Sequence, residues 1–181
     1  NKQRYTLMQY IKTFENYTTS SLESLKTMLT AMSKMGSGIQ QELAKAKLAA
    51  VKPCRCVKLA AAIGEDNAKV LLSRVSIKQK ECYANALHVA ERCSELGVEY
   101  CEGWMFYHGI PIDHAFNKIG DIYFDVTAEF ALKDNPEMRE YAVLGSWNPT
   151  TALMIMATGP YKCYGDVFNK EFFETHQENV K

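Results

Sequence analysis

The chain has 181 residues, 47% of them hydrophobic, and its 21 Lys and Arg residues balance 21 Asp and Glu residues. A chain of this length can bury one sizeable core. Its zero formal charge lacks the basic excess with which proteins bind phosphate backbones, which disfavours a nucleic-acid partner. No apolar run approaches the roughly 18 residues that span a bilayer, so we expect a soluble protein without a membrane partner.

Six cysteines lie along the chain without the even spacing of a disulfide framework: Cys54, Cys56, Cys82, Cys93, Cys101 and Cys163. They are too sparse for a disulfide scaffold, so we expect reduced thiols in a cytoplasmic protein. The first residue, Asn1, leaves a removed leader open as an alternative. The Cys-Arg-Cys run at residues 54–56 invites a zinc site, but no second close pair of Cys or His follows it. We therefore expect no metal and no other cofactor.

A capping box and an apolar stripe predict a helix early in the chain. Ser20 and Glu23 have the spacing of the box. Apolar residues then recur at intervals of three and four until glycines at positions 36 and 38 end the helix, and these are Leu22, Leu25, Leu29 and Met32. The stripe indicates either core packing or a face for a protein partner.

Further helices are expected on both sides of this one. The apolar residues of an earlier helix are Leu7, Ile11 and Phe14. A later helix covers residues 39–51 and ends before Pro53, whereas residues 66–77 are ambiguous between helix and strand. We expect residues 1–76 to form a helical N-terminal region or cap, and residues 77–181 to form a core that is one compact unit with it.

The core begins with a helix over residues 81–97, whose small face (Ala86, Ala90 and Cys93) lets another element approach closely. Strand-like segments follow at residues 98–107, 112–118 and 121–127. After Thr127 we expect only helices. Two begin at Asn-Pro pairs, Asn135-Pro136 and Asn148-Pro149, and a last one covers residues 166–176. The order predicts an α+β fold in which a helix packs on a small antiparallel sheet.

Cys82 lies in the first turn of the core helix. Unpaired backbone N–H groups and the positive end of the helix dipole favour an anion at this position. A thiolate is such an anion, so the thiol pKa falls and the sulfur becomes a better nucleophile near neutral pH.

The last two strand segments supply an imidazole and a carboxylate. If these strands pair symmetrically about Ile119 and Gly120, His114 lies directly opposite Asp125, with Cβ atoms about 5 Å apart on one face. The carboxylate could then hold the imidazole in one tautomer and stabilise its charged form. A bulge or a one-residue slip would point the two side chains to opposite faces.

Four short runs of the core carry a resemblance to a known family. In chain order they are Cys82-Tyr83-Ala84-Asn85-Ala86, Glu102-Gly103-Trp104, Asp113-His114-Ala115-Phe116 and Tyr123-Phe124-Asp125-Val126-Thr127. They resemble the catalytic helix, the following strand, the His-Ala-aromatic strand and the Asp-x-Thr strand of transglutaminase-like cysteine enzymes. The resemblance covers about residues 81–127, roughly a quarter of the chain.

The resemblance implies a papain- or transglutaminase-like core behind the helical N-terminal part. It also implies the roles of three residues: Cys82 is the nucleophile, His114 its general base and acid, and Asp125 the residue that orients the imidazole. Family members often carry Gly before the nucleophile, where this chain has Glu81. They often carry Trp where this chain has Phe116.

Three further residues are candidates for binding substrate. Gln79 could donate its side-chain amide to an oxyanion alongside the backbone N–H of Cys82. Trp104 and Phe116 could line the cleft. The alternatives are a solvated loop glutamine and aromatic core residues.

These residues indicate a cysteine-dependent acyl-transfer enzyme with a thioester mechanism and a Cys-His-Asp triad. We expect it to hydrolyse a peptide or amide bond of a peptide or protein substrate, because water is the default acceptor. One alternative is a protein-glutamine transamidase or deamidase. Another is an inactive relative of the same fold that binds a protein partner through its N-terminal helices, and these helices could also cover the cleft.

Overall fold

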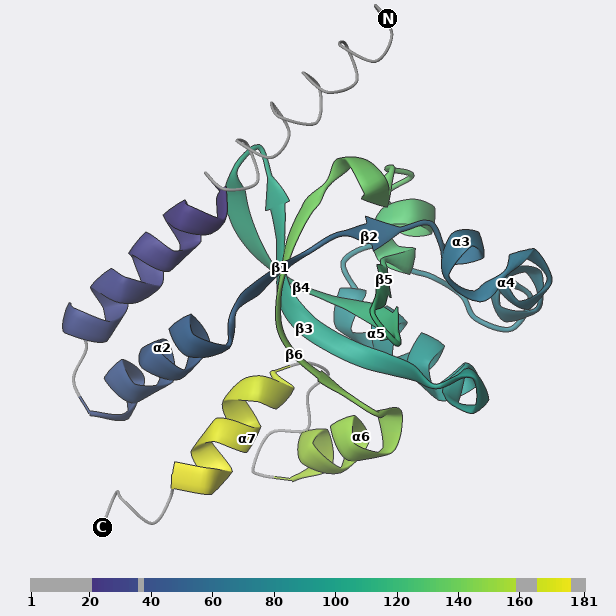
Figure 1. Ribbon diagram of the computed structural model, residues 1–181. Helices are drawn as coiled ribbons and strands as arrows, with labels where there is room; N and C mark the ends of the chain where they lie inside the picture. Colours follow the sequence, from purple (N-terminus) through teal and green to yellow (C-terminus); the bar gives the residue numbers. More distant parts are fainter. Residues whose placement is uncertain (1–20, 36–37, 159–165, 177–181) are drawn as a thin grey trace, which may run out of the picture.

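The computed structural model describes residues 21–35, 38–158 and 166–176. It shows an α+β fold, in which an N-terminal helix pair precedes a six-stranded mixed sheet curled like a half-barrel, with further helices packed on it (Figure 1). The strand order is β1-β6-β3-β4-β5-β2. In this order the strands are Lys52–Cys54, Glu140–Trp147, Val98–Tyr107, Ile110–Ile119, Ile122–Phe124 and Cys56–Val57. Neighbours are antiparallel except β2 and β5.

The hairpin of β3 and β4 is the centre of the sheet. Ten residues of each strand pair from Val98 opposite Ile119 to Tyr107 opposite Ile110. His108 and Gly109 form the connection with φ angles of 49° and 79°, the left-handed conformation that a two-residue hairpin turn requires. The strand at residues 98–107 is confirmed, and β4 begins two residues before the expected start.

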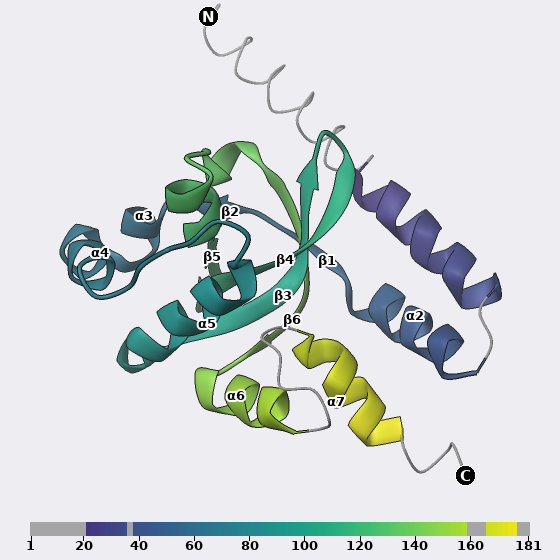
Figure 2. The ribbon, with the colours of Figure 1, turned by 180° about the vertical axis from the view of Figure 1, so that it is seen from behind.

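Helix α5 (Cys82–Arg92) covers one face of this hairpin, and Figure 2 shows it in front of β3 and β4. Ala86 and Ala90 are buried against the sheet, so the small face predicted for this helix is confirmed. Asn117 of β4 donates a hydrogen bond of 2.8 Å to the carbonyl of Ala86. This bond fixes the position of the first half of α5 along β4.

The N-terminal helix pair consists of residues 21–35 and α2 (Ile39–Ala50). Leu22, Leu25 and Leu29 are buried in a cluster with Val51, Trp104, Phe106 and Ala142. Of the predicted stripe only Met32 faces water, with 52% of its surface exposed. Ser20 of the predicted capping box lies outside the described residues, as do the apolar residues of the earlier helix.

Several shorter helices complete the described part. Between β2 and α5 lie α3 (Leu59–Ile63) and α4 (Glu65–Leu72), and after β6 lie α6 (Pro149–Ala157) and α7 (Val167–His176). Asn148 accepts a hydrogen bond from the backbone N–H of Thr151, and Asn135 accepts one from Glu137 at the 3-10 turn η3 (Pro136–Met138). Both predicted Asn-Pro caps are confirmed.

The prediction that everything after Thr127 is helical is wrong. β6 lies there, paired with both β3 and β1, and the segment from Thr127 to Ala131 is a single π-helical turn, η2. The N-terminal region is not purely helical either, because β1 and β2 belong to it. These two strands have three and two residues, too few for a periodic pattern to stand out.

The hairpin of β4 and β5 pairs in a different register from the prediction. Ile119 lies opposite Ile122, so the turn is at residues 120–121. The expectation that His114 and Asp125 are direct cross-strand partners is therefore wrong, and Asp125 follows the end of β5. The register differs by two residues. Because side chains alternate with a period of two, Asp125 still reaches the face on which His114 lies.

Gly103 is the point of closest approach between β3 and β6. A Cβ at this position would lie 2.0 Å from the carbonyl oxygen of Ala142. The register of β6 against β3 also shifts between Glu102 and Gly103. The glycine therefore allows the bulge that curls the sheet beside His114, its partner on β4.

In the part of the chain that the structure describes, no helix combines the length and the apolar character needed to cross a bilayer.

Replacing Leu25 by Ala should lower the free energy of unfolding by about 2–5 kcal/mol, because the side chain is fully buried between the N-terminal helix and the sheet. Denaturant unfolding of the purified variant measures this. The matched control is Met32→Ala on the same helix, which should change the value by less than about 0.5 kcal/mol. Equal effects of the two substitutions would contradict the packing described here.

Candidate active site

Cys82 is the first residue of α5, and its side chain is half-buried. Glu81 precedes the helix without capping it by a side-chain hydrogen bond. The N–H groups of the first turn are therefore left for other acceptors. Backbone hydrogen bonds from Tyr83 and from Ala115 of β4 reach the sulfur of Cys82 and favour its thiolate form.

His114 and Asp125 form a buried pair. They are 4% and 1% exposed, and Nε2 of His114 lies 2.7 Å from Oδ2 of Asp125. The other carboxylate oxygen accepts hydrogen bonds from the backbone N–H groups of Thr127 and Ala128, at 2.9 and 3.0 Å. These two bonds fix the carboxylate at the start of the π-helical turn, so the carboxylate can hold the ring in one orientation.

The side chains of Cys82 and His114 lie close enough for each to shift the pKa of the other. Because Nε2 faces Asp125, Nδ1 is the ring nitrogen left for the sulfur. Burial on its own raises the pKa of the Cys82 thiol, but the hydrogen bond and charge of His114 outweigh it and hold the pKa below its ordinary value. Burial lowers the pKa of His114, but the charge of Asp125 and the hydrogen bonds to Asp125 and Cys82 raise it to about 10. The lowered pKa of the thiol and the raised pKa of the imidazole both favour a thiolate paired with an imidazolium.

Tyr141 of β6 completes the surroundings of Asp125. Its hydroxyl donates a hydrogen bond of 3.0 Å to the same Oδ2 that faces His114. Sequence reasoning missed this residue because it did not predict β6. The apolar, β-branched and aromatic run from Tyr141 to Trp147 is the signal that could have indicated a strand.

Asn85 is a second residue that the sequence reasoning missed. It is buried on α5, one turn after Cys82. Its side chain accepts from the N–H of Lys78 and donates to the carbonyl of Lys78, at 3.1 and 2.7 Å, and donates to the hydroxyl of Thr127 at 3.0 Å. Asn85 therefore fixes the loop before Cys82 to the turn that carries Asp125. A polar residue on the buried face of an amphipathic helix is the signal that could have found it.

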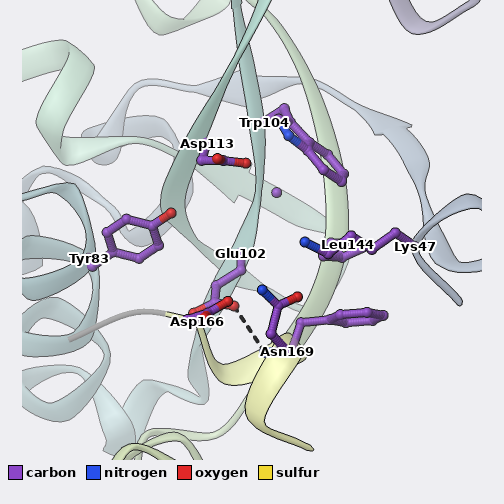
Figure 3. Close-up of a pocket in the computed structure, with 10 residues that line it drawn as sticks. Lys47, Tyr83, Glu102, Trp104, Asp113, Leu144, Asp166 and Asn169 are labelled. Carbon is purple, nitrogen blue, oxygen red and sulfur yellow. Dashed lines mark hydrogen bonds between the residues drawn. The ribbon is translucent and has the colours of Figure 1, made fainter. Parts of the chain in front are cut away.

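The three candidate substrate-binding residues lie in different surroundings. Gln79 is exposed, and its amide donates a 3.0 Å hydrogen bond to the carbonyl of Ala131. Phe116 is fully buried and stacks 6.5 Å from the ring of His114. It forms a wall behind the imidazole. Trp104 packs on the opposite face of the hairpin and lines a pocket there with Tyr83, the neighbour of Cys82 (Figure 3).

Cys54 is half-buried and Cys56 is fully buried, and both are free thiols. Burial raises the pKa of Cys54 to about 12 and raises that of Cys56 well above its ordinary value. Among the residues that the structure describes, no group of three or more His, Cys, Asp or Glu side chains is arranged to hold a metal ion.

Comparison of the chain with models of protein families, with curated proteins and with solved structures found no match.

The rate at which iodoacetamide alkylates Cys82 should rise with pH around a midpoint below the value of about 8.5 of a free thiol, because the folded protein favours the thiolate. In His114→Ala the midpoint should move above that of the parent protein, since burial then acts without the opposing charge. Peptide mapping by mass spectrometry at a series of pH values gives the rate for each thiol.

Cys93 is the internal control in the same samples, because burial raises its pKa. Its alkylation should require higher pH than that of Cys82 and should not respond to His114→Ala. A midpoint for Cys82 that equals that of Cys93, or that is unchanged in His114→Ala, would contradict the electrostatics described above.

Proposed function

We propose that this chain is a cysteine-dependent acyl-transfer enzyme that forms a thioester on Cys82 and hydrolyses a peptide or amide bond. One observation carries the proposal: a buried imidazole is held between the carboxylate of Asp125 and a thiol whose pKa is lowered at the start of a helix. A thiol and an imidazole whose pKa values are shifted toward each other at a helix start are typical of catalytic sites, which favours an enzyme over an inactive binding module.

The proposed reaction begins with the Cys82 thiolate. Its sulfur forms a bond to the substrate carbonyl carbon, and the carbonyl electrons move to oxygen. The imidazolium of His114 then gives its Nδ1 proton to the departing nitrogen as the carbon–nitrogen bond breaks. This step leaves a thioester on Cys82 and a neutral imidazole.

A second step returns the enzyme to its first state. Water loses a proton to Nδ1 of His114 and adds to the thioester carbon, and the carbon–sulfur bond breaks to give the carboxylic acid and the thiolate. An amine in place of water would give transamidation, and a glutamine side chain as the acyl donor would give deamidation. The same groups serve all three outcomes.

Asp125 acts in both steps by keeping Nε2 of His114 occupied, so that Nδ1 stays directed at the sulfur. The backbone N–H of Cys82 at the start of α5 is suited to bind the oxyanion. Gln79 as its second donor stays a prediction. One amide hydrogen of Gln79 already serves the carbonyl of Ala131, and the other is left for this role.

The layout of the chain supports a papain- or transglutaminase-like core as the finer description of the fold. A nucleophile at a helix start is followed by a strand hairpin that carries the histidine, and then by the carboxylate, in the order of that family. A reducing cytoplasm would preserve the thiolate, because oxidation of Cys82 would remove the nucleophile.

Incubation of the protein with a pool of peptides that contain glutamine and lysine tests the proposal. Mass spectrometry separates cleavage, deamidation and cross-linking of the pool. We expect cleavage products that are absent with Cys82→Ser and are formed about 10²–10⁴-fold more slowly with His114→Ala, the usual contribution of a general base and acid. Cys93→Ser, which removes a thiol at the opposite end of α5 from Cys82, should leave the rate unchanged.

Two results would count against the proposal. Products that persist in Cys82→Ser would show a different source of activity, and a lack of any product with the parent protein would favour the binding module. Cross-linked or deamidated products in place of cleavage would keep the mechanism and change the acceptor.

A further inference from the structure

A pocket of about 90 Å³ is lined by Tyr83, the residue that follows Cys82, and lies on the face of the β3–β4 hairpin opposite to His114 (Figure 3). Its walls come from α2, α5, α7 and the hairpin. Asp113 and His114 are neighbours on β4, and strand side chains alternate between faces. A backbone hydrogen bond from Ala115, the next residue along β4, reaches the sulfur of Cys82, so the thiol lies close to the strand whose residues carry the imidazole on one face and line the pocket on the other.

Three carboxylates and one ammonium group line the pocket, namely Glu102, Asp113, Asp166 and Lys47. In Figure 3 Asp113 lies above the pocket, Glu102 and Asp166 lie together below it, and Lys47 lies to the right. Asp113 and Asp166 are exposed and form no salt bridge with any residue that the structure describes. The pocket therefore carries a net negative charge next to the proposed nucleophile.

The hydroxyl of Tyr83 interacts electrostatically with both the pocket carboxylates and Cys82. Burial raises the pKa of its hydroxyl, and the negative charges of Cys82, Asp113 and Glu102 raise it further. One hydroxyl thus lies within electrostatic reach of both the thiolate and the carboxylates. A substrate group attached to an acyl carbon at Cys82 could reach the pocket past this ring.

Asn169 gives an observation that is independent of the charges. Its Oδ1 atom is buried and has no hydrogen-bond partner within the described part of the chain. The side chain rises from α7 toward the centre of the pocket in Figure 3. A buried acceptor without a donor is unfavourable, so the pocket lacks a donor that a ligand would supply.

We propose that this pocket binds a primary ammonium group of the substrate, so that the enzyme acts where a lysine side chain or a free amine lies next to the reacting carbonyl. The inference rests on the proposed function, because it takes Cys82 as the reacting residue. An ammonium group offers three donors and a positive charge. These match the carboxylates and the unpartnered Asn169 acceptor, whereas the indole ring of Trp104 and the ring of Phe168 would enclose its methylene stem.

Methanethiosulfonate reagents of different charge test the pocket directly. In each reaction the Cys82 thiolate forms a disulfide with the reagent's thioalkyl group and methanesulfinate leaves. The neutral methyl reagent reports the reactivity of the thiol, and the aminoethyl and sulfonatoethyl reagents add a cation or an anion. We expect the aminoethyl reagent to label Cys82 faster than the methyl reagent, and the sulfonatoethyl reagent to label it more slowly.

Asp113→Asn and Asp166→Asn should each lower the ratio of aminoethyl to methyl rates by about threefold, the factor for one unit charge about 7 Å away in water. Asp66→Asn is the matched control, because Asp66 lies on α4 with a fully exposed side chain and is absent from the pocket. It removes the same charge and should leave the ratio unchanged. A ratio that stays constant in both pocket variants overturns the inference.

The methyl reagent separates failure of this inference from failure of the proposed function. Fast methyl labelling that depends on His114, without any charge preference, overturns only the ammonium pocket. Slow methyl labelling that is unchanged in His114→Ala overturns both the ammonium pocket and the proposed function.

A second experiment identifies the source of the ammonium group. One arm compares peptides that contain lysine or acetyl-lysine, and another offers a diamine as acceptor. Preference for lysine over acetyl-lysine assigns the pocket to the acyl substrate, and incorporation of the diamine assigns it to the acceptor. If the protein shows neither behaviour, the inference is overturned.

Discussion

The carboxylate of Asp125 accepts four hydrogen bonds from groups in three parts of the chain: the ring of His114 on β4, the hydroxyl of Tyr141 on β6, and the N–H groups of Thr127 and Ala128. A buried charge is strongly unfavourable unless such partners replace water. The positions of β4, β6 and the π-helical turn are therefore bound to one another through this group. The imidazole of His114 therefore has a fixed orientation and a raised pKa, and its positive charge lowers the pKa of Cys82.

Much of this site could be predicted from the sequence because its parts are local. Cys82 opens a helix for reasons that lie within a few residues of it, and the two hairpins follow from short alternating segments and turn residues. The contact between His114 and Asp125 survives an incorrect register because the register differs by an even number of residues. A difference of one residue would have placed the carboxylate of Asp125 on the other face of the sheet, where it could not contact His114.

The parts of the site that could not be predicted depend on pairing between segments far apart in the chain. β6 pairs with β3 and with β1, which lies almost 90 residues earlier, and no local pattern encodes that choice. Tyr141 enters the site only through this pairing. The same holds for the pocket, where Lys47 of α2 meets Asn169 of α7. The predicted boundary near residue 76 lies between segments that share one sheet and one pocket.

Glu102 and Asp125 are buried carboxylates on opposite faces of the sheet, and they differ in whether a charged group faces them. Glu102 accepts hydrogen bonds from Tyr100 and from the N–H groups of Val167 and Phe168 at the start of α7, which also attaches the C-terminal helix to β3. Asp125 additionally faces a cation, His114, whereas none of the hydrogen bonds to Glu102 comes from a charged group. Burial accordingly raises the pKa of Glu102 in spite of these donors. An ammonium group in the adjoining pocket would supply a cation for Glu102, and the sheet would then carry one carboxylate that raises the pKa of His114 and one that faces a bound cation.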